Sequence, residues 1–214
     1  MDLNLIQKIA IYSLPVMFAI TLHEAAHGYV ARHFGDPTAY MLGRVTLNPI
    51  KHIDPIGTIL VPLLSLLLGG ILFGWAKPVP VNFAQLRNPK RDMFWVAAAG
   101  PGANLVMIIF WAVIIRLAGV IPDNPFALPM VLMGEAGMII NAVLMVLNLV
   151  PLPPLDGGRI AVSLLPMPWA GHLAKIEPYG FFILIALLFT GMLNIVIGPL
   201  IKGTLQQISS LFGV

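Results

Sequence analysis

Residues 9–27 read IAIYSLPVMFAITLHEAAH, an apolar run that ends in two histidines with a glutamate between them. His23 and His27 are four positions apart, so both imidazoles lie on one face of a helix and can bind one Zn²⁺. Glu24 follows the first histidine and can reach a water molecule on the same metal. The apolar run is long enough to belong to a membrane-spanning helix. The stretch therefore predicts a zinc centre within a membrane.

The composition of the chain is typical of an integral membrane protein. Its 214 residues are 58% hydrophobic and 10% charged, and the mean hydropathy is +0.91, which excludes an ordinary soluble domain. The chain has no cysteine, so any metal must be held by histidine and carboxylate. The net charge is +3, and the basic residues lie between apolar segments, which favours positive-inside topology over nucleic-acid binding.

Five apolar segments follow one another along the chain, and we expect an all-α polytopic membrane protein that forms a single domain over residues 1–214. The segments are residues 5–34, 56–73, 94–117, 128–150 and 179–200. The core is expected at about residues 5–160, with an additional helix and tail at about 178–214. Short β-strands are expected in the connections, at residues 41–47 or 78–82. Either strand would offer an edge to an extended peptide.

The fourth apolar segment ends in a proline-rich stretch, in which residues 148–159 read NLVPLPPLDGGR. The three prolines break the helix, and irregular backbone at membrane depth must line a cavity or pack on protein. A catalytic zinc needs three protein ligands, and Asp156 is a suitable third ligand beside His23 and His27. The alternative is that Asp156 only caps a turn before Gly157.

The position of Asp156 also bears on the membrane topology. If residues 56–73 crossed the membrane, Asp156 would end on the face opposite His27, and the three ligands would be separated. If residues 56–73 are re-entrant, both basic connections lie on one side and the ligands meet. We therefore expect this segment to enter the membrane and return.

Three motifs in this order resemble those of the site-2 protease family of intramembrane zinc metalloproteases, peptidase family M50. They are HEAAH at residues 23–27, GPGAN at residues 100–104, and Asn148 followed by LDGG at residues 155–158. The resemblance covers residues 9–159. No PDZ-like or nucleotide-sensing domain is found in these 214 residues, so the chain resembles a compact form of the family.

This resemblance implies a role for each motif residue. His23, His27 and Asp156 would bind one zinc ion per chain. Glu24 would be the general base. Asn148 would position the substrate backbone or stabilise the oxyanion. Asn104 would contact substrate or would only pack and hydrogen-bond between helices.

The implied activity is hydrolysis of peptide bonds in transmembrane or membrane-proximal segments of other proteins by zinc-activated water. The partners would be a transmembrane protein substrate and the lipid bilayer, with no nucleic acid. The expected location is a prokaryotic inner cell membrane, crossed several times, with the site toward the cytoplasmic side. The alternatives are a membrane zinc transporter or a metal-binding membrane scaffold. Glu24 favours an enzyme over a scaffold because it is not a ligand, and a transporter usually needs ligands on several helices and more spans.

Overall fold

Three long apolar helices form the body of the protein in the computed structural model, which describes residues 4–60, 77–121 and 125–214. They are α1 (Leu5–His33), α4 (Pro89–Val120) and α5 (Ala127–Asn148). Each is long and apolar enough to cross a membrane. Their bounds are close to the predicted segments 5–34, 94–117 and 128–150, so the helical membrane class is confirmed for the described residues.

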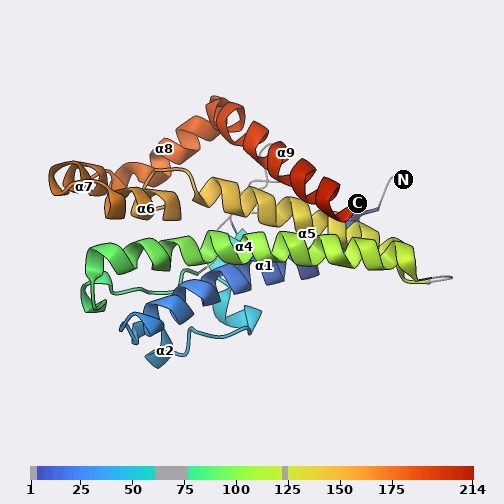
Figure 1. The fold of residues 1–214 in the computed structure, drawn as a ribbon, viewed down its shortest axis with the longest axis horizontal. Helices are drawn as coiled ribbons and strands as arrows, with labels where there is room; N and C mark the ends of the chain where they lie inside the picture. Colours follow the sequence, from blue (N-terminus) through green and yellow to red (C-terminus); the bar gives the residue numbers. More distant parts are fainter. Residues whose placement is uncertain (1–3, 61–76, 122–124) are drawn as a thin grey trace.

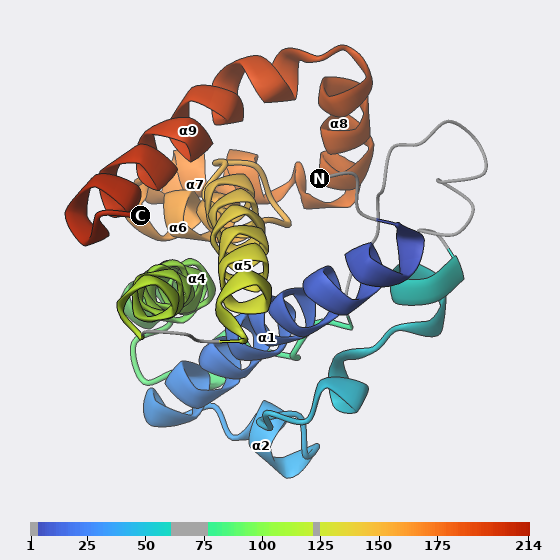
Figure 2. The ribbon, with the colours of Figure 1, turned by 90° about the vertical axis from the view of Figure 1, so that its right-hand side faces the viewer.

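Helix α4 packs against both α1 and α5. It runs opposite to α1 and α5, so it begins at the end of the bundle where α1 and α5 terminate (Figure 1), and α1 crosses the pair obliquely (Figure 2). Ile108 and Trp111 of α4 are buried against Ala142 of α5. A Cβ atom on Gly137 of α5 would lie 2.4 Å from the Trp111 ring. The absence of a side chain at this position thus lets the two helices approach closely.

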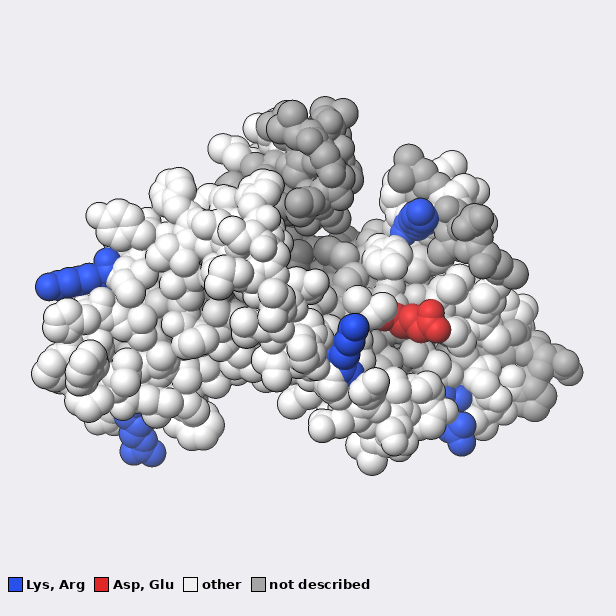
Figure 3. All heavy atoms as spheres, turned by 90° about the horizontal axis from the view of Figure 1, so that it is seen from above, with Lys and Arg blue, Asp and Glu red and all other residues white. Residues whose placement is uncertain are grey.

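The outer faces of these helices are apolar. Large hydrophobic side chains point outward from each, including Ile6 of α1 (77% exposed), Val106 of α4 (65%) and Leu128 of α5 (52%). On the face drawn in Figure 3, charged side chains are few and most of the surface is uncharged. Such a surface matches hydrocarbon rather than water, and the chain is a membrane protein.

The C-terminal part contains four more helices: α6 (Asp156–Leu164), α7 (Met167–Ala174), α8 (Glu177–Phe189) and α9 (Met192–Phe212). The single helix expected at residues 179–200 is wrong, because α8 and α9 are separate and meet at an angle (Figure 1). Gly191 lies between them with φ of 74°, a left-handed conformation that ends a helix. Helix α9 then extends through most of the expected tail.

The connection from α1 to α4 contains only short helical turns among its described residues. They are α2 (Thr38–Met41), η1 (Pro49–His52), η2 (Pro55–Leu60) and η3 (Phe83–Gln85). The expected β-strands are wrong: residues 42–47 form turns and bends, and residues 78–82 are extended without a strand partner among the described residues. Pro78 and Pro80 have no N–H to donate, so this piece cannot form a regular ladder.

The predicted re-entrant segment, residues 56–73, lies largely outside the described residues. Its first residues belong to η2, a π-helical turn. The connection leaves α1 and enters α4 at the same end of the bundle (Figure 1), as a segment that returns to its starting side would require. Re-entry itself stays a prediction.

Candidate metal centre

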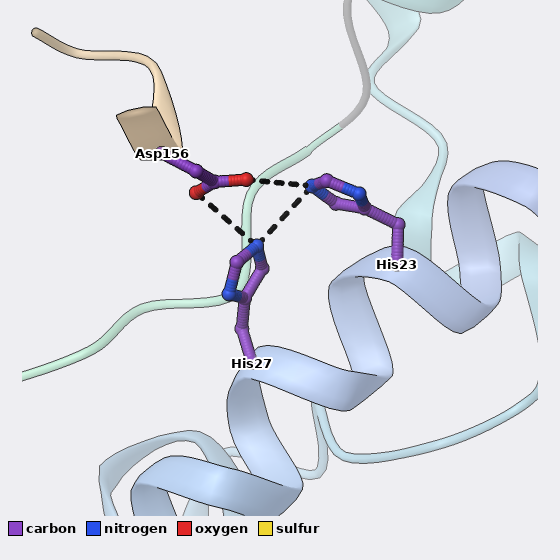
Figure 4. Close-up of side chains that lie close together, drawn as sticks. All are labelled: His23, His27 and Asp156. Carbon is purple, nitrogen blue, oxygen red and sulfur yellow. Dashed lines mark hydrogen bonds and ion pairs between the residues drawn. The ribbon is translucent and has the colours of Figure 1, made fainter. Parts of the chain in front are cut away.

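His23 and His27 of α1 point toward Asp156, the first residue of α6 (Figure 4). The Nε2 atoms of the two histidines are 3.2 Å apart. Oδ2 of Asp156 lies 3.2 Å from Nε2 of His23, and Oδ1 lies 3.3 Å from Nε2 of His27. The three side chains are 10%, 12% and 13% exposed, in chain order. Three side chains from positions up to 133 residues apart in the sequence thus meet in one buried cluster of ligand atoms.

The size of this cluster fits a tetrahedral zinc ion. Zinc–ligand bonds of about 2.0–2.1 Å at the tetrahedral angle place two ligand atoms about 3.3 Å apart. The separation of the two Nε2 atoms has that length, and so does each contact from Asp156, which reaches His23 with Oδ2 and His27 with Oδ1. In addition, Oδ2 of Asp156 is buried without a hydrogen bond among the described residues, although it is close to His23. A buried carboxylate oxygen of this kind needs a cation or a donor.

The hydrogen bonds behind the two histidines fix which ring nitrogen carries the proton. Nδ1–H of His27 donates to the carbonyl oxygen of Val96, at 2.7 Å. Nδ1–H of His23 donates to Oδ1 of Asn104, at 2.6 Å. Both Nε2 atoms therefore carry lone pairs that face each other, and two lone pairs at 3.2 Å repel unless a cation lies between them. The donor set fits one zinc ion.

The charge of Asp156 completes the set. Burial raises the pKa of its carboxyl group, but the hydrogen bonds and positive charge that His23 and His27 offer when protonated outweigh burial and hold this pKa at about 2. Asp156 is therefore an anion at neutral pH, which is the state that binds a metal.

Asn104 belongs to a buried hydrogen-bond chain that reaches α5. Its Nδ2 donates to the carbonyl oxygen of Ala19 at 3.3 Å and to Oδ1 of Asn141 at 2.9 Å. Asn141 in turn donates from Nδ2 to the carbonyl oxygen of Gly137, at 2.8 Å. Asn104 and Asn141 are fully buried. The chain holds Oδ1 of Asn104 against Nδ1 of His23, the ring nitrogen that does not face Asp156.

Glycines at two places, Gly100 in α4 and the Gly157–Gly158 pair in α6, allow the candidate ligands to come together. A Cβ atom on Gly100 of α4 would lie 2.4 Å from Nε2 of His27 and 2.5 Å from Cε1 of His23. After the proline-rich turn, a Cβ on Gly157 would lie 2.3 Å from the carbonyl oxygen of Leu149, and one on Gly158 would lie 2.2 Å from the nitrogen of Pro153. Larger residues at these positions would push α4 or α6 away from the centre.

The two candidate catalytic residues occupy different places. Glu24 lies between the two histidines in sequence, is partly buried, and its Oε2 accepts a hydrogen bond from the Val79 N–H at 2.7 Å. Asn148 ends α5, and its Nδ2 donates to the carbonyl oxygen of Leu144 in its own helix, at 3.0 Å. The Glu24 carboxylate is therefore bonded to the backbone of residue 79, whereas the side chain of Asn148 is engaged within α5.

No role for Asn141 or Val79 was predicted from the sequence. Asn141 was visible as a polar residue within an apolar segment, which is a signal for a buried contact. Val79 contacts Glu24 through its backbone N–H, and the identity of a side chain gives no signal for such a contact.

Comparison with known proteins finds named relatives but no matching family model and no significantly similar solved structure. The chain is 38% identical to the Bacillus subtilis protein named "Putative zinc metalloprotease YwhC". This match of 202 residues covers 93% of this chain and 89% of that protein. It is also 33% identical to "Putative zinc metalloprotease Rip2" of Mycolicibacterium smegmatis. This match of 180 residues covers 83% of this chain and 66% of that protein.

Proposed function

Because this chain belongs to the site-2 protease family of intramembrane zinc metalloproteases, we propose that it hydrolyses peptide bonds in transmembrane or membrane-proximal segments of other proteins. The observation that carries this proposal is the triangle of His23, His27 and Asp156, with both imidazole Nε2 atoms free to bind a metal. Three protein ligands leave the fourth tetrahedral position open, as in catalytic rather than structural zinc sites.

In the proposed mechanism, His23, His27 and Asp156 would hold a zinc ion, which would supply the Lewis acidity that acidifies water and polarises the scissile carbonyl. Glu24 takes the proton from the attacking water and passes it to the leaving amine. Asn148 orients the substrate backbone or stabilises the oxyanion, for which its amide must leave the Leu144 carbonyl. Val96 and Asn104 keep the imidazoles oriented throughout.

The burial of the site supports a membrane protein as the substrate. His23 and His27 lie within a helix whose outer face is apolar, so a substrate reaches them from the bilayer or its edge. A helical substrate must unwind locally there, because its amides are otherwise bonded within the helix.

The charges at one end of the bundle support an orientation in the cell membrane. Arg32 and His33 lie in the last turn of α1, and Lys90 and Arg91 lie in the first turn of α4, at the same end (Figure 1). By the positive-inside rule this end faces the cytoplasm. His27 is then about 9 Å from the cytoplasmic end of α1, from the helical rise of six residues.

Zinc content and cleavage, measured in the same detergent samples, test the proposal. The substrates are a panel of fusion proteins, each with one apolar helix of about 20 residues between two soluble reporters. Wild type should hold one zinc ion and cleave at least one substrate. Glu24→Gln should hold zinc and cleave none, and Asp156→Ala should hold less zinc.

Two results would overturn the proposal. One is cleavage by Glu24→Gln at the wild-type rate. The other is a zinc-loaded wild type that cleaves no member of the panel but carries Zn²⁺ across liposome membranes, which would identify a zinc transporter.

A further inference from the structure

Residues 77–82 form an extended strap beside α1. The N–H group of Lys77 donates to the carbonyl oxygen of His52 at 2.9 Å. Nη2 of Arg44 donates to the carbonyl oxygens of Lys77 at 2.8 Å and Pro78 at 3.3 Å. At the other end, the N–H of Asn82 donates to Oδ2 of Asp36 at 2.7 Å. The strap is therefore held on both sides of Val79 by bonds that do not involve the metal centre.

The middle of the strap is stiff and has a single hydrogen-bond donor. Pro78 and Pro80 flank Val79, and their rings fix φ and remove their own N–H groups. The Val79 side chain is 7% exposed, and its Cγ1 is 3.2 Å from the position of a Cβ built on Gly28, one turn beyond Glu24 on α1. The only N–H within residues 78–80 is thus aimed in a fixed direction, and it donates to Oε2 of Glu24.

This bond occupies one oxygen of the Glu24 carboxylate and leaves the other available. Oε1 makes no hydrogen bond with any described residue, whereas Oε2 is held at 2.7 Å. A carboxylate that takes a proton must present one oxygen to water in a defined direction, because misplacement by about 1 Å can cost about a hundredfold in rate. The hydrogen bond from the Val79 N–H restrains the Glu24 carboxylate and so supplies that direction.

We propose that the backbone N–H of Val79 orients the Glu24 carboxylate for proton transfer, which makes Val79 a positioning residue of the active site. The proposal rests on the proposed protease function, in which Glu24 is the general base. It places a determinant of the rate in a segment 55 residues away from Glu24 in the sequence.

The test removes the hydrogen bond from the Val79 N–H to Glu24 and keeps the strap in place. Val79→Pro deletes the donor within a sequence that is already Pro-Val-Pro, where an extended conformation suits proline. Val81→Pro is the matched control, because the Val81 N–H has no acceptor among the described residues. Val79→Ala keeps the N–H and removes most of the side chain.

Kinetics on the full-length, zinc-loaded protein should separate these variants, with a fusion substrate that wild type cleaves. Val79→Pro should lower kcat at least about tenfold, with KM and zinc content within about twofold of wild type. Val81→Pro should keep the wild-type kcat, and Val79→Ala should exceed Val79→Pro by at least about tenfold. A wild-type kcat in Val79→Pro would overturn the proposal, as would a raised KM with an unchanged kcat, which would make the strap a substrate-binding element.

If Val79→Pro loses zinc or unfolds, hydrogen exchange tests the hydrogen bond between the Val79 N–H and Glu24 instead. The Val79 amide should exchange at least about tenfold faster in Glu24→Ala than in wild type, whereas the Asn82 amide should exchange equally in both. Equal exchange at Val79 in the two proteins would overturn the inference. Failure of the protease function is distinguished by a different result, namely absence of cleavage by wild type or cleavage by Glu24→Gln.

Discussion

Beyond the three candidate ligands, Asn104 is the residue whose hydrogen bonds bear most directly on the metal centre. Its motif, GPGAN, left substrate contact and helix packing as alternatives. The structure places its Oδ1 against Nδ1 of His23, and the buried chain through Asn141 holds it there. This geometry favours an effect on the metal rather than on the substrate.

Replacement of Asn104 by leucine should therefore weaken zinc binding by about 10–100-fold, because Nδ1–H of His23 loses its acceptor in a buried site. Competition with a chelator of known affinity measures the change. Asn194→Leu on the exposed side of α9 is the control for the loss of a helical amide. An unchanged zinc affinity in Asn104→Leu would contradict the assignment.

Gly100→Ala should reduce zinc content sharply, since its Cβ would meet both imidazole rings at 2.4–2.6 Å. Gly102→Ala, two residues along the same helix, adds a Cβ that meets nothing within 4 Å, and should keep its zinc while the helix gains up to about 1 kcal/mol from alanine's higher propensity. Metal analysis and thermal unfolding of the two purified variants test this contrast, and equal zinc contents would refute it.

Some of these residues were predictable and others were not, for a physical reason. His23, Glu24 and His27 lie within one turn of helix, so their spacing alone predicts a shared face. Asp156 required the order of the motifs and the need for a third ligand. The part played by Val79 depends on a backbone N–H and on where the strap lies, and no local pattern encodes either.

Helix α8 supports the turn that carries Asp156, although it contributes no ligand. A Cβ on Gly180 would lie 1.7 Å from the carbonyl oxygen of Pro153, so α8 touches the backbone of the proline-rich stretch directly. Glu177 at the start of α8 also pairs with Arg159 of α6, at 2.8 Å. The position of α6 therefore depends on α8.

Gly180→Ala should displace the proline-rich turn and lower zinc occupancy, although residue 180 touches no ligand. Gly171→Ala on α7 is the matched control, because its Cβ would meet nothing within 4 Å. Zinc per protein after gel filtration is the measurement. Full zinc occupancy in Gly180→Ala would show that α8 does not hold the turn.

The three long helices were predictable from the sequence, whereas the helix break at Gly191 and the absence of strands in the connections were not. The helices α1, α4 and α5 follow from apolar length, because a span of hydrocarbon needs about 20 apolar residues. The break at Gly191 was missed because a glycine inside an apolar segment does not by itself end a helix. The expected strands failed because extended residues such as 78–82 become strands only when a partner is adjacent.

For the whole molecule, the arrangement of the three long helices predicts sidedness in the membrane. The chain has no native cysteine, so single cysteines can be labelled without background. Met41 and Ile121 are 71% and 50% exposed, and Asn88 is also exposed. Met41→Cys and Asn88→Cys should react with a membrane-impermeant reagent from the cytoplasmic side, and Ile121→Cys from the outside. Labelling of Met41→Cys and Asn88→Cys from opposite sides would mean that residues 56–73 cross the membrane.

The most direct test of the account is to locate the bond that the zinc-loaded protein cuts. Mass spectrometry of the products from a single-span fusion substrate identifies this bond, and Glu24→Gln with equal zinc content is the reference. We predict a cut within or at the edge of the apolar segment by wild type, lost on zinc removal and absent in Glu24→Gln. A cut confined to the soluble reporters, or one that persists in Glu24→Gln, would contradict intramembrane hydrolysis at this centre.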